Sequence, residues 1–229
     1  MVSSVVQVLG TSYSPYANRV QIALNLKSVD FEYIEQNLIS KTDLLLRSNP
    51  VNKKVPVLIH GDKCISESLV IVQYIDETWS SNGHSFLPSD AYDRAIARFW
   101  PAYFDDKLVP LMRDLRSAQG EDKLALIERL EEGMVVLEKA FVKCSKGKAY
   151  FGGDNIGIID IAVGSCLGWI KAMEKMNSFK LIHKDKTPGL TGWADTFMSN
   201  DAVKNVIPEP QVFIELLKKM QPMAKPASN

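Results

Sequence analysis

Ser14 and Pro15 stand where a loop gives way to a helical pattern. A Ser–Pro pair is an ordinary helix start, because serine caps the first N–H groups and proline suits the first helical position. The same arrangement can also direct a hydroxyl at a bound anion. A thiol with a pKa near about 8.5 needs its anion stabilised to act as a nucleophile at neutral pH. Lowering that pKa by ~2 units takes about 2.7 kcal/mol, which one hydroxyl bond and a helix dipole can supply. Ser14 thus has two interpretations, a helix cap or a hydroxyl that stabilises a thiolate.

A second candidate site surrounds the run LIHGDKCISES and the Val55-Pro56 step just before it. The run predicts a short strand, a turn, a second short strand and a helix that opens on Glu67 and Ser68. Proline is tolerated at the entrance of a strand but not in its middle. The first N–H groups of the helix and the positive end of its dipole suit a carboxylate ligand.

Positive charge gathers near the same edge of the predicted sheet, at Lys41, Lys53 and Lys54. Each lysine alone is an ordinary surface charge, and Glu67 alone can satisfy the first turn of its own helix. Together these groups suit a zwitterionic peptide. Its amine would meet Glu67, one carboxylate the Ser68 end of the helix, and the other carboxylate the lysines. The backbone of Val55 can pair with the amide of such a peptide.

The elements that must position these residues alternate over the first third of the chain. Short β-branched runs bounded by turn residues predict strands, and apolar residues at three- and four-residue spacing predict helices. The predicted strands are 5–9, 31–35, 55–59 and 64–66, and the predicted helices are 16–27, a short one near 44–46, and 67–79. The order βαβαββα indicates a four-stranded mixed sheet with helices packed on it.

The remainder of the chain has helical periodicity only. Residues 81–90 are rich in Ser, Gly, Asn and Pro and are predicted to link a domain at 1–80 to an all-helical domain at 91–229. The predicted helices are 91–116, bent or broken near Pro101 or Pro110, then 121–143, 158–172, 191–199 and 212–220. Because 158–172 is apolar nearly all round, it is expected to be the buried central helix. The fold class is therefore α+β.

Composition excludes several kinds of protein. The chain has 229 residues, with 27 basic and 27 acidic side chains. This balance argues against nucleic acid or an anionic membrane surface as the main partner. No secretory signal and no apolar run long enough to span a bilayer is visible, so a cytoplasmic protein is expected.

Cysteine and histidine are too sparse to indicate a metal site. Cys64, Cys144 and Cys166 form no CxxC pair, and an odd, small number of cysteines is typical of a reducing compartment. The histidines are expected to be solvated in turns or loops rather than to bind metal: His60, His84 and His183. No phosphate-binding glycine motif is present.

Four runs resemble the cytosolic glutathione transferases, and they cover almost the whole chain in the expected order. They are SPYANRVQIAL, NKKVPVLIHGDKCISESLVIVQYIDETW, RFWPAYFDDKL and KAYFGGDNIGIIDIA. Within them, LLxxNPVxKKVPVLIH and ESLxIVQYIDExW are similar to the plant tau class. The resemblance implies a thioredoxin-like N-terminal domain with a cis Val55-Pro56 bond, followed by an all-helical domain.

The resemblance also implies an activity and a set of contacts. Glutathione would be a co-substrate, with no covalently bound cofactor, and Ser14 would hold and activate its thiolate. The family's contacts to the glycine end of glutathione fall on Lys41 and Lys54, and its backbone contact to the cysteinyl amide falls on Val55. Its contacts to the γ-glutamyl group fall on Glu67 and Ser68. The pocket for the electrophile would draw on Tyr13, Tyr16, Val109, Met112, Arg113, Trp169, Phe213 and Leu217.

Several points depart from the family or stay open. Many tau members have Phe where this chain has Tyr16, and Gly157 is a weak helix cap, so the Asp160 carboxylate would have to supply most of the capping. The expected activity is conjugation of glutathione to apolar electrophiles. The alternatives are peroxidase or isomerase chemistry at the same site, and a carrier that binds apolar metabolites without turnover. A homodimer is implied, with interface ion pairs expected at Glu77, Arg94 and Arg98.

Overall fold

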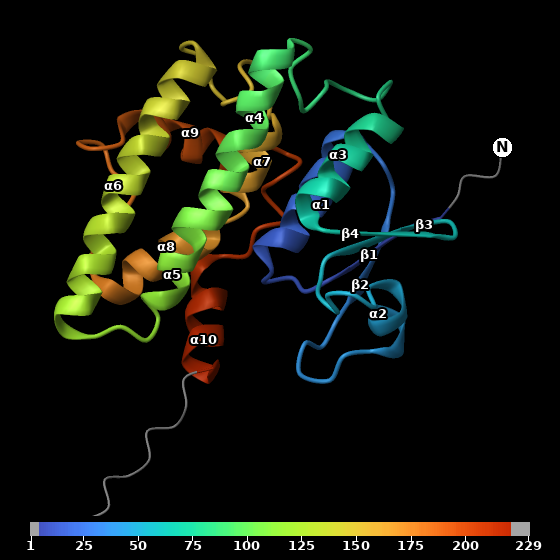
Figure 1. Cartoon of the computed structure of the whole chain (residues 1–229), viewed down its shortest axis with the longest axis horizontal. Helices are drawn as coiled ribbons and strands as arrows, with labels where there is room; N and C mark the ends of the chain where they lie inside the picture. Colours follow the sequence, from blue (N-terminus) through green and yellow to red (C-terminus); the bar gives the residue numbers. More distant parts are fainter. Residues whose placement is uncertain (1–4, 221–229) are drawn as a thin grey trace, which may run out of the picture.

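A four-stranded mixed sheet forms one side of the molecule (Figure 1). In this computed structural model, which describes residues 5–220, the strand order is β2-β1-β3-β4. The strands are β1 (Val6–Gly10), β2 (Glu32–Glu35), β3 (Val57–His60) and β4 (Lys63–Ser66). β1 is parallel to β2, whereas β3 is antiparallel to β1 and β4. The predicted mixed sheet is confirmed, with strand ends shifted by one or two residues.

Helices cover both faces of this sheet. They are α1 (Pro15–Leu26), α2 (Asp43–Ser48) and α3 (Ser68–Thr78). Val8 and Leu58 belong to the large core that contains residues of α1 and α3. Leu9 and Val57, their neighbours along the strands, pack instead with Leu45 of α2. This division follows from the two-residue alternation of side chains along a strand.

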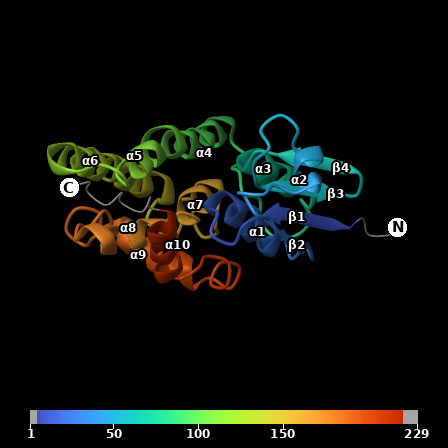
Figure 2. The ribbon, with the colours of Figure 1, turned by 90° about the horizontal axis from the view of Figure 1, so that it is seen from below.

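The rest of the described chain is helical. Its elements are α4 (Ala91–Tyr103), the π-helix η1 (Phe104–Leu108), α5 (Val109–Asp114), α6 (Gly120–Ser145), α7 (Ile158–Gly164), α8 (Leu167–Asn177), α9 (Pro188–Ser199) and α10 (Pro210–Met220). Figure 2 shows α4, α5 and α6 on one side and α8, α9 and α10 on the other, with α7 beside the sheet domain. The predicted α+β class is confirmed. The predicted limits 1–80, 81–90 and 91–229 stay predictions, and their ends at 1–4 and 221–229 lie outside the described residues.

The segment predicted as one helix over 91–116 is interrupted by the π-helix. Pro101 lies inside α4 without ending it. The interruption comes directly before Pro110, which has no N–H to donate to the carbonyl of Asp106. π-Helices are rare and occur mostly as single turns inside α-helices, as this one does between α4 and α5.

The segment predicted as one helix over 158–172 is two helices, α7 and α8. The Ser165 hydroxyl donates to the carbonyl of Ala162 at 3.1 Å, and the Cys166 N–H donates to the carbonyl of Val163 at 3.0 Å. Both bonds span three residues, so they tighten the turn where α7 ends. Every residue of α7 is buried, which confirms the predicted central position.

Asp160 caps α7, as the sequence predicts. Its carboxylate accepts from the backbone N–H of Gly157 at 2.8 Å, Phe151 at 2.8 Å and Gly152 at 3.0 Å. It also accepts from the indole N–H of Trp193 at 2.7 Å. One buried carboxylate therefore joins α7, the loop before it and α9.

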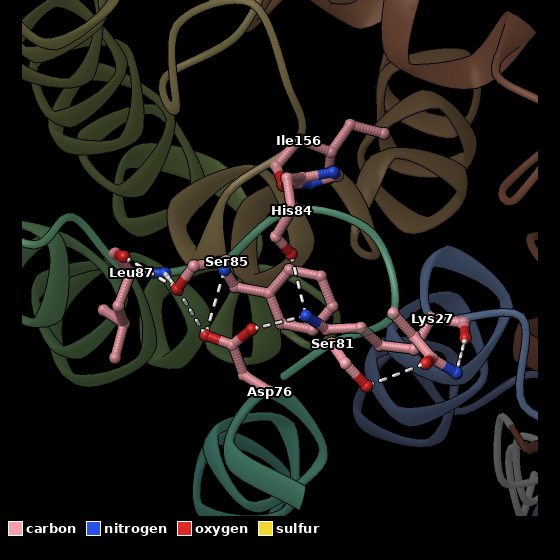
Figure 3. Close-up of polar contacts among 9 residues, drawn as sticks. Lys27, Asp76, Ser81, His84, Ser85, Leu87 and Ile156 are labelled. Atoms are coloured by element: carbon pink, nitrogen blue, oxygen red, sulfur yellow. Dashed lines mark hydrogen bonds and ion pairs between the residues drawn. The ribbon is translucent and has the colours of Figure 1, made fainter. Parts of the chain in front are cut away.

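A buried ion pair ties the sheet domain to the segment that leads into the helical domain (Figure 3). Lys27 Nζ lies 2.8 Å from Asp76 Oδ1 and also donates to the carbonyl of His84 at 2.8 Å. Asp76 Oδ2 accepts from the Ser85 hydroxyl at 3.0 Å and the Phe86 N–H at 2.9 Å. Both charges are desolvated, so each depends on the other. The segment 81–90 is therefore held against α1 and α3.

The prediction that the three histidines are solvated in turns or loops holds only in part. All three are only partly exposed and take part in hydrogen bonds. His60 ends strand β3 and its Nδ1 pairs with the Tyr74 hydroxyl at 2.8 Å, whereas His84 Nε2 donates to the carbonyl of Ile156 at 2.7 Å. His183 Nδ1 accepts from the Asp185 N–H at 3.3 Å. Tertiary packing covers turns and strand ends that look exposed in the sequence.

None of the helices in the described range combines the length and apolar character that crossing a membrane requires.

Replacing Lys27 by Met should strongly destabilise the fold, because Asp76 would keep its burial but lose its cation. Breaking a buried pair in this way costs about 3 kcal/mol or more. Urea unfolding would measure the loss, with Lys139→Met, an exposed lysine on α6, as the control. An equal unfolding midpoint in both variants would contradict the proposed importance of the pair.

Candidate active site

A polar groove of about 260 Å³ lies where the entrance of β3 meets the start of α3. It is lined by Tyr16, Asn49, Lys54, Val55, Pro56, Glu67 and Ser68. The Val55-Pro56 bond is cis, as the family resemblance implies. Lys54, Val55, Glu67 and Ser68 are thus brought together, whereas the exposed Lys41 does not line the groove.

The start of α3 gives the groove a set of unpaired donors. Glu67 is the N-cap of α3, and no side chain caps the helix. Glu67 has a φ of 73°, a left-handed conformation that costs energy for a residue other than glycine. The Asn52 side chain donates to Glu67 Oε1 at 2.8 Å and holds that carboxylate near the groove. The open N–H groups and the helix dipole favour a bound anion beside Ser68.

Arg19, which sequence reasoning missed, supports Ser68 from inside the protein. Its guanidinium is fully buried and donates to Ser68 Oγ at 3.2 Å. It pairs in a bidentate manner with Asp105 at 2.7 and 2.6 Å and donates to the carbonyl of Ala162 at 2.9 Å. Burial lowers the pKa of Arg19, but the hydrogen bond and charge of Asp105 outweigh it, so the guanidinium stays positive. The sequence signal that could have identified this residue is an arginine among the apolar residues of the helix predicted at 16–27.

Ser14 is the N-cap of α1. Its buried Oγ accepts from the Ala17 N–H at 3.3 Å, which satisfies the cap interpretation. No acceptor for the hydroxyl proton is recorded among residues 5–220, so the proton is available to a ligand. Ser14 does not line the polar groove or the apolar cavity that adjoins it. Pro15 lines the apolar cavity, and Tyr16 lines both.

An apolar cavity of about 340 Å³ adjoins this end of α1. It is lined by Pro15, Tyr16, Val109, Met112, Arg113, Arg116, Cys166, Trp169, Met173 and Leu217. Six of the residues predicted for the electrophile pocket therefore line it: Tyr16, Val109, Met112, Arg113, Trp169 and Leu217.

Tyr13 and Phe213 do not line this cavity, contrary to the prediction. They pack with Trp169 in a separate cluster: the indole N–H donates to the carbonyl of Tyr13 at 3.0 Å, and the Phe213 ring lies 4.8 Å from the indole. Trp169 thus stands between these two residues and the cavity. Cys166 and Met173 were missed, although they fall on the same face of a helix as Trp169.

Cys166 is held as a thiol, because burial raises its pKa to about 11. This side chain therefore contributes shape rather than a nucleophile. Among the described residues, no group of three His, Cys, Asp or Glu side chains is suited to hold a metal ion.

Tyr16 lines both the polar groove and the apolar cavity. Its ring lies under the Arg19 guanidinium, 4.9 Å from the ring centroid. Burial and the nearby charge of Asp105 raise the pKa of Tyr16, so its phenol is neutral at physiological pH. Ligands in the two cavities would therefore both contact this ring.

Comparisons with known proteins agree with this geometry. Residues 4–77 match the family model of the glutathione S-transferase N-terminal domain, and residues 99–201 match that of the C-terminal domain. The chain is 52% identical over 223 residues to glutathione S-transferase U17 of Arabidopsis thaliana, covering 97% of this chain and 98% of that one. It is also 52% identical over 226 residues to U16 of the same plant, covering 98% and 97%.

Solved structures give the same result. The tau-class glutathione S-transferase MiGSTU from mango, Mangifera indica, superposes with a TM-score of 0.92 at 52% identity, covering 95% of this chain and 99% of that one. Rice OsGSTU1, solved in complex with glutathione, superposes with a TM-score of 0.85 at 33% identity, covering 93% and 96%. The chain belongs to the glutathione S-transferase family. Within that family, these relatives confirm the predicted tau class.

Replacing Arg19 by Met should destabilise the protein by about 3 kcal/mol, because Asp105 would lose its cation and Ser68 its donor. The loss would appear in urea unfolding. Arg129→Met removes an exposed arginine of α6, and it should cost less than about 1 kcal/mol. If both variants unfold at the same urea concentration, the contacts of Arg19 across the two domains do not contribute to the stability of the fold.

Proposed function

We propose that this protein conjugates glutathione to apolar electrophiles, with Ser14 stabilising the glutathione thiolate. The observation that carries the proposal is the position of Tyr16, whose side chain lines both a polar groove and an apolar cavity. Two reactants bound on either side of one residue are held close together, and proximity of this kind is a major source of rate enhancement.

Glutathione would lie along the polar groove. Its α-amine would meet the Glu67 carboxylate, and its γ-glutamyl carboxylate the Ser68 hydroxyl and the N-terminus of α3. Val55 would pair through its backbone with the cysteinyl amide. The glycine carboxylate would meet Lys54, which lines the groove, and Lys41, whose exposed side chain would have to reach in. Rice OsGSTU1, similar in fold, has been solved with glutathione bound.

Ser14 would act on the thiolate as a hydrogen-bond donor. Its oxygen already accepts the Ala17 N–H, so its own proton remains for the sulfur. The thiolate then attacks an electrophilic carbon in the apolar cavity, the new C–S bond forms, and the leaving group departs with its electron pair. The protein supplies an activated nucleophile and proximity, and no protein nucleophile is used.

Ser14→Ala should keep glutathione affinity but lose turnover by ~10²-fold, about 2.7 kcal/mol of transition-state stabilisation. The measurements are steady-state conjugation of 1-chloro-2,4-dinitrobenzene and calorimetric titration with glutathione. Ser12→Ala, an exposed serine two residues earlier, is the control. If the wild type binds glutathione but turns over neither electrophiles nor cumene hydroperoxide, the carrier alternative replaces the transferase.

Tyr16→Phe should change kcat/KM for the same electrophile by less than about threefold, because the ring that separates the cavities and lies under Arg19 remains. Tyr16→Ala should lower kcat/KM by about tenfold, since it removes that wall and the cation–π contact, together about 1.4 kcal/mol. A large loss in Tyr16→Phe would instead assign a catalytic role to the hydroxyl.

The protein is further proposed to act as a homodimer in the cytoplasm. Val70 of α3 and Phe99 of α4 are 53% and 54% exposed, and a partner subunit would cover these apolar side chains. Among the described residues, the recorded acceptors of the Arg94 and Arg98 side chains are uncharged, and no ion pair is recorded for Glu77. These charges therefore remain for a partner subunit.

A further inference from the structure

A second, wider cavity of about 700 Å³ adjoins the apolar cavity. Both are lined by Arg113, Arg116, Met173 and Leu217, so they share a wall. The wider cavity lies where α5, the 115–119 turn and the start of α6 face α8 and α10. We call it the basic basin, because its charged lining residues are Arg113, Arg116 and Lys123 and none is acidic.

These cations are poorly neutralised within the described chain. Arg113 meets only Asp114, at 3.6 Å and on the surface. For the side chains of Arg116 and Lys123, no hydrogen bond or ion pair is recorded among residues 5–220. The acids of the same region, Asp114, Glu121 and Asp122, do not line the basin.

Of these three cations, Lys123 has the surroundings that most clearly indicate a site for an anion. It lies in the first turn of α6, where the helix dipole opposes a positive charge, and it is half-buried beside the basin. A cation held in this position without a protein partner creates a positive potential inside a concave site. Such a site attracts anions.

We propose that the basic basin is an anion subsite, and that the ligands of this protein are amphipathic carboxylates. The apolar body of the ligand occupies the apolar cavity, and its carboxylate extends past Arg116 to Lys123. As a statement about substrates this rests on the proposed transferase function, but the binding step does not depend on turnover. Apolar burial would supply most of the affinity, and the cations would select for the charge.

The binding test compares decanoate with decan-1-ol, which share an apolar chain and differ in charge at neutral pH. In calorimetric titration, decanoate should bind the wild type about tenfold more tightly. Lys123→Gln should weaken decanoate binding by about threefold, and Lys123→Glu by about tenfold, with decan-1-ol unchanged. Lys139→Gln, an exposed lysine roughly 24 Å further along α6, should alter neither ligand. Added salt should reduce the difference between the two ligands.

The kinetic test uses 6-isothiocyanatohexanoic acid and its methyl ester as acceptors. The thiolate adds to the central carbon, the C–S bond forms, and the electron pair of the C=N bond moves to nitrogen, which takes a proton. Lys123→Gln should lower kcat/KM about threefold for the acid and leave the ester and 1-chloro-2,4-dinitrobenzene unchanged.

The outcomes separate the two proposals. If decanoate and decan-1-ol bind equally, or if Lys123→Glu leaves decanoate binding unchanged, the anion subsite is wrong, whatever the conjugation rates. If decanoate binding depends on Lys123 while no acceptor is conjugated, the subsite stands and the transferase proposal fails.

Discussion

The buried guanidinium of Arg19 is the interaction on which the rest of the structure depends. It reaches from α1 to the start of α3, to the π-helix and to α7, and so it joins the sheet domain to the helical domain. A charge with no exposure to water must have all its donors satisfied. Asp105, Ser68 and Ala162 provide that satisfaction only when both domains are docked. The groove at Ser68 and the packing of the domains therefore form together.

Four residues in or directly beside helix α1 have different roles. The Ser14 hydroxyl, at its N-terminus, has no acceptor recorded among residues 5–220, and Tyr16 lines both the polar groove and the apolar cavity. Arg19 hydrogen-bonds residues of both domains where they meet. Lys27, just past the last turn of α1, holds the connecting segment 81–90 through its own contact with His84 and through Asp76. Because these groups share one rigid helix, the position of the thiolate-stabilising hydroxyl relative to the apolar cavity is set by the same contacts that hold the domains.

The polar groove, the apolar cavity and the basic basin differ in chemical character, and each shares lining residues with the next. The groove beside Ser68 suits a zwitterionic peptide, the cavity beside Trp169 suits an apolar body, and the basin beside Lys123 suits an anion. The second and third are both lined by residues of α5, α8 and α10, to which α1 adds residues in the second and α6 in the third. The π-helix directly precedes α5, which carries Pro110. The polar groove is built by the sheet domain, whereas most of the lining of the apolar cavity comes from the helical domain, so acceptor preference can vary with little change around the nucleophile.

Local patterns in the sequence determined the strands, the order βαβαββα, the cap on α7 and the motifs that bring Lys54, Val55, Glu67 and Ser68 to one groove. Alternation, helical spacing and turn residues are properties of neighbouring residues, so they can be read without the fold. Tertiary structure alone decided the position of Arg19, whose partners lie 86 and 143 residues away. It also left Tyr13 and Phe213 outside the lining of the apolar cavity and assembled the basic basin. These features depend on which distant elements meet, and periodicity along one chain carries no information on that.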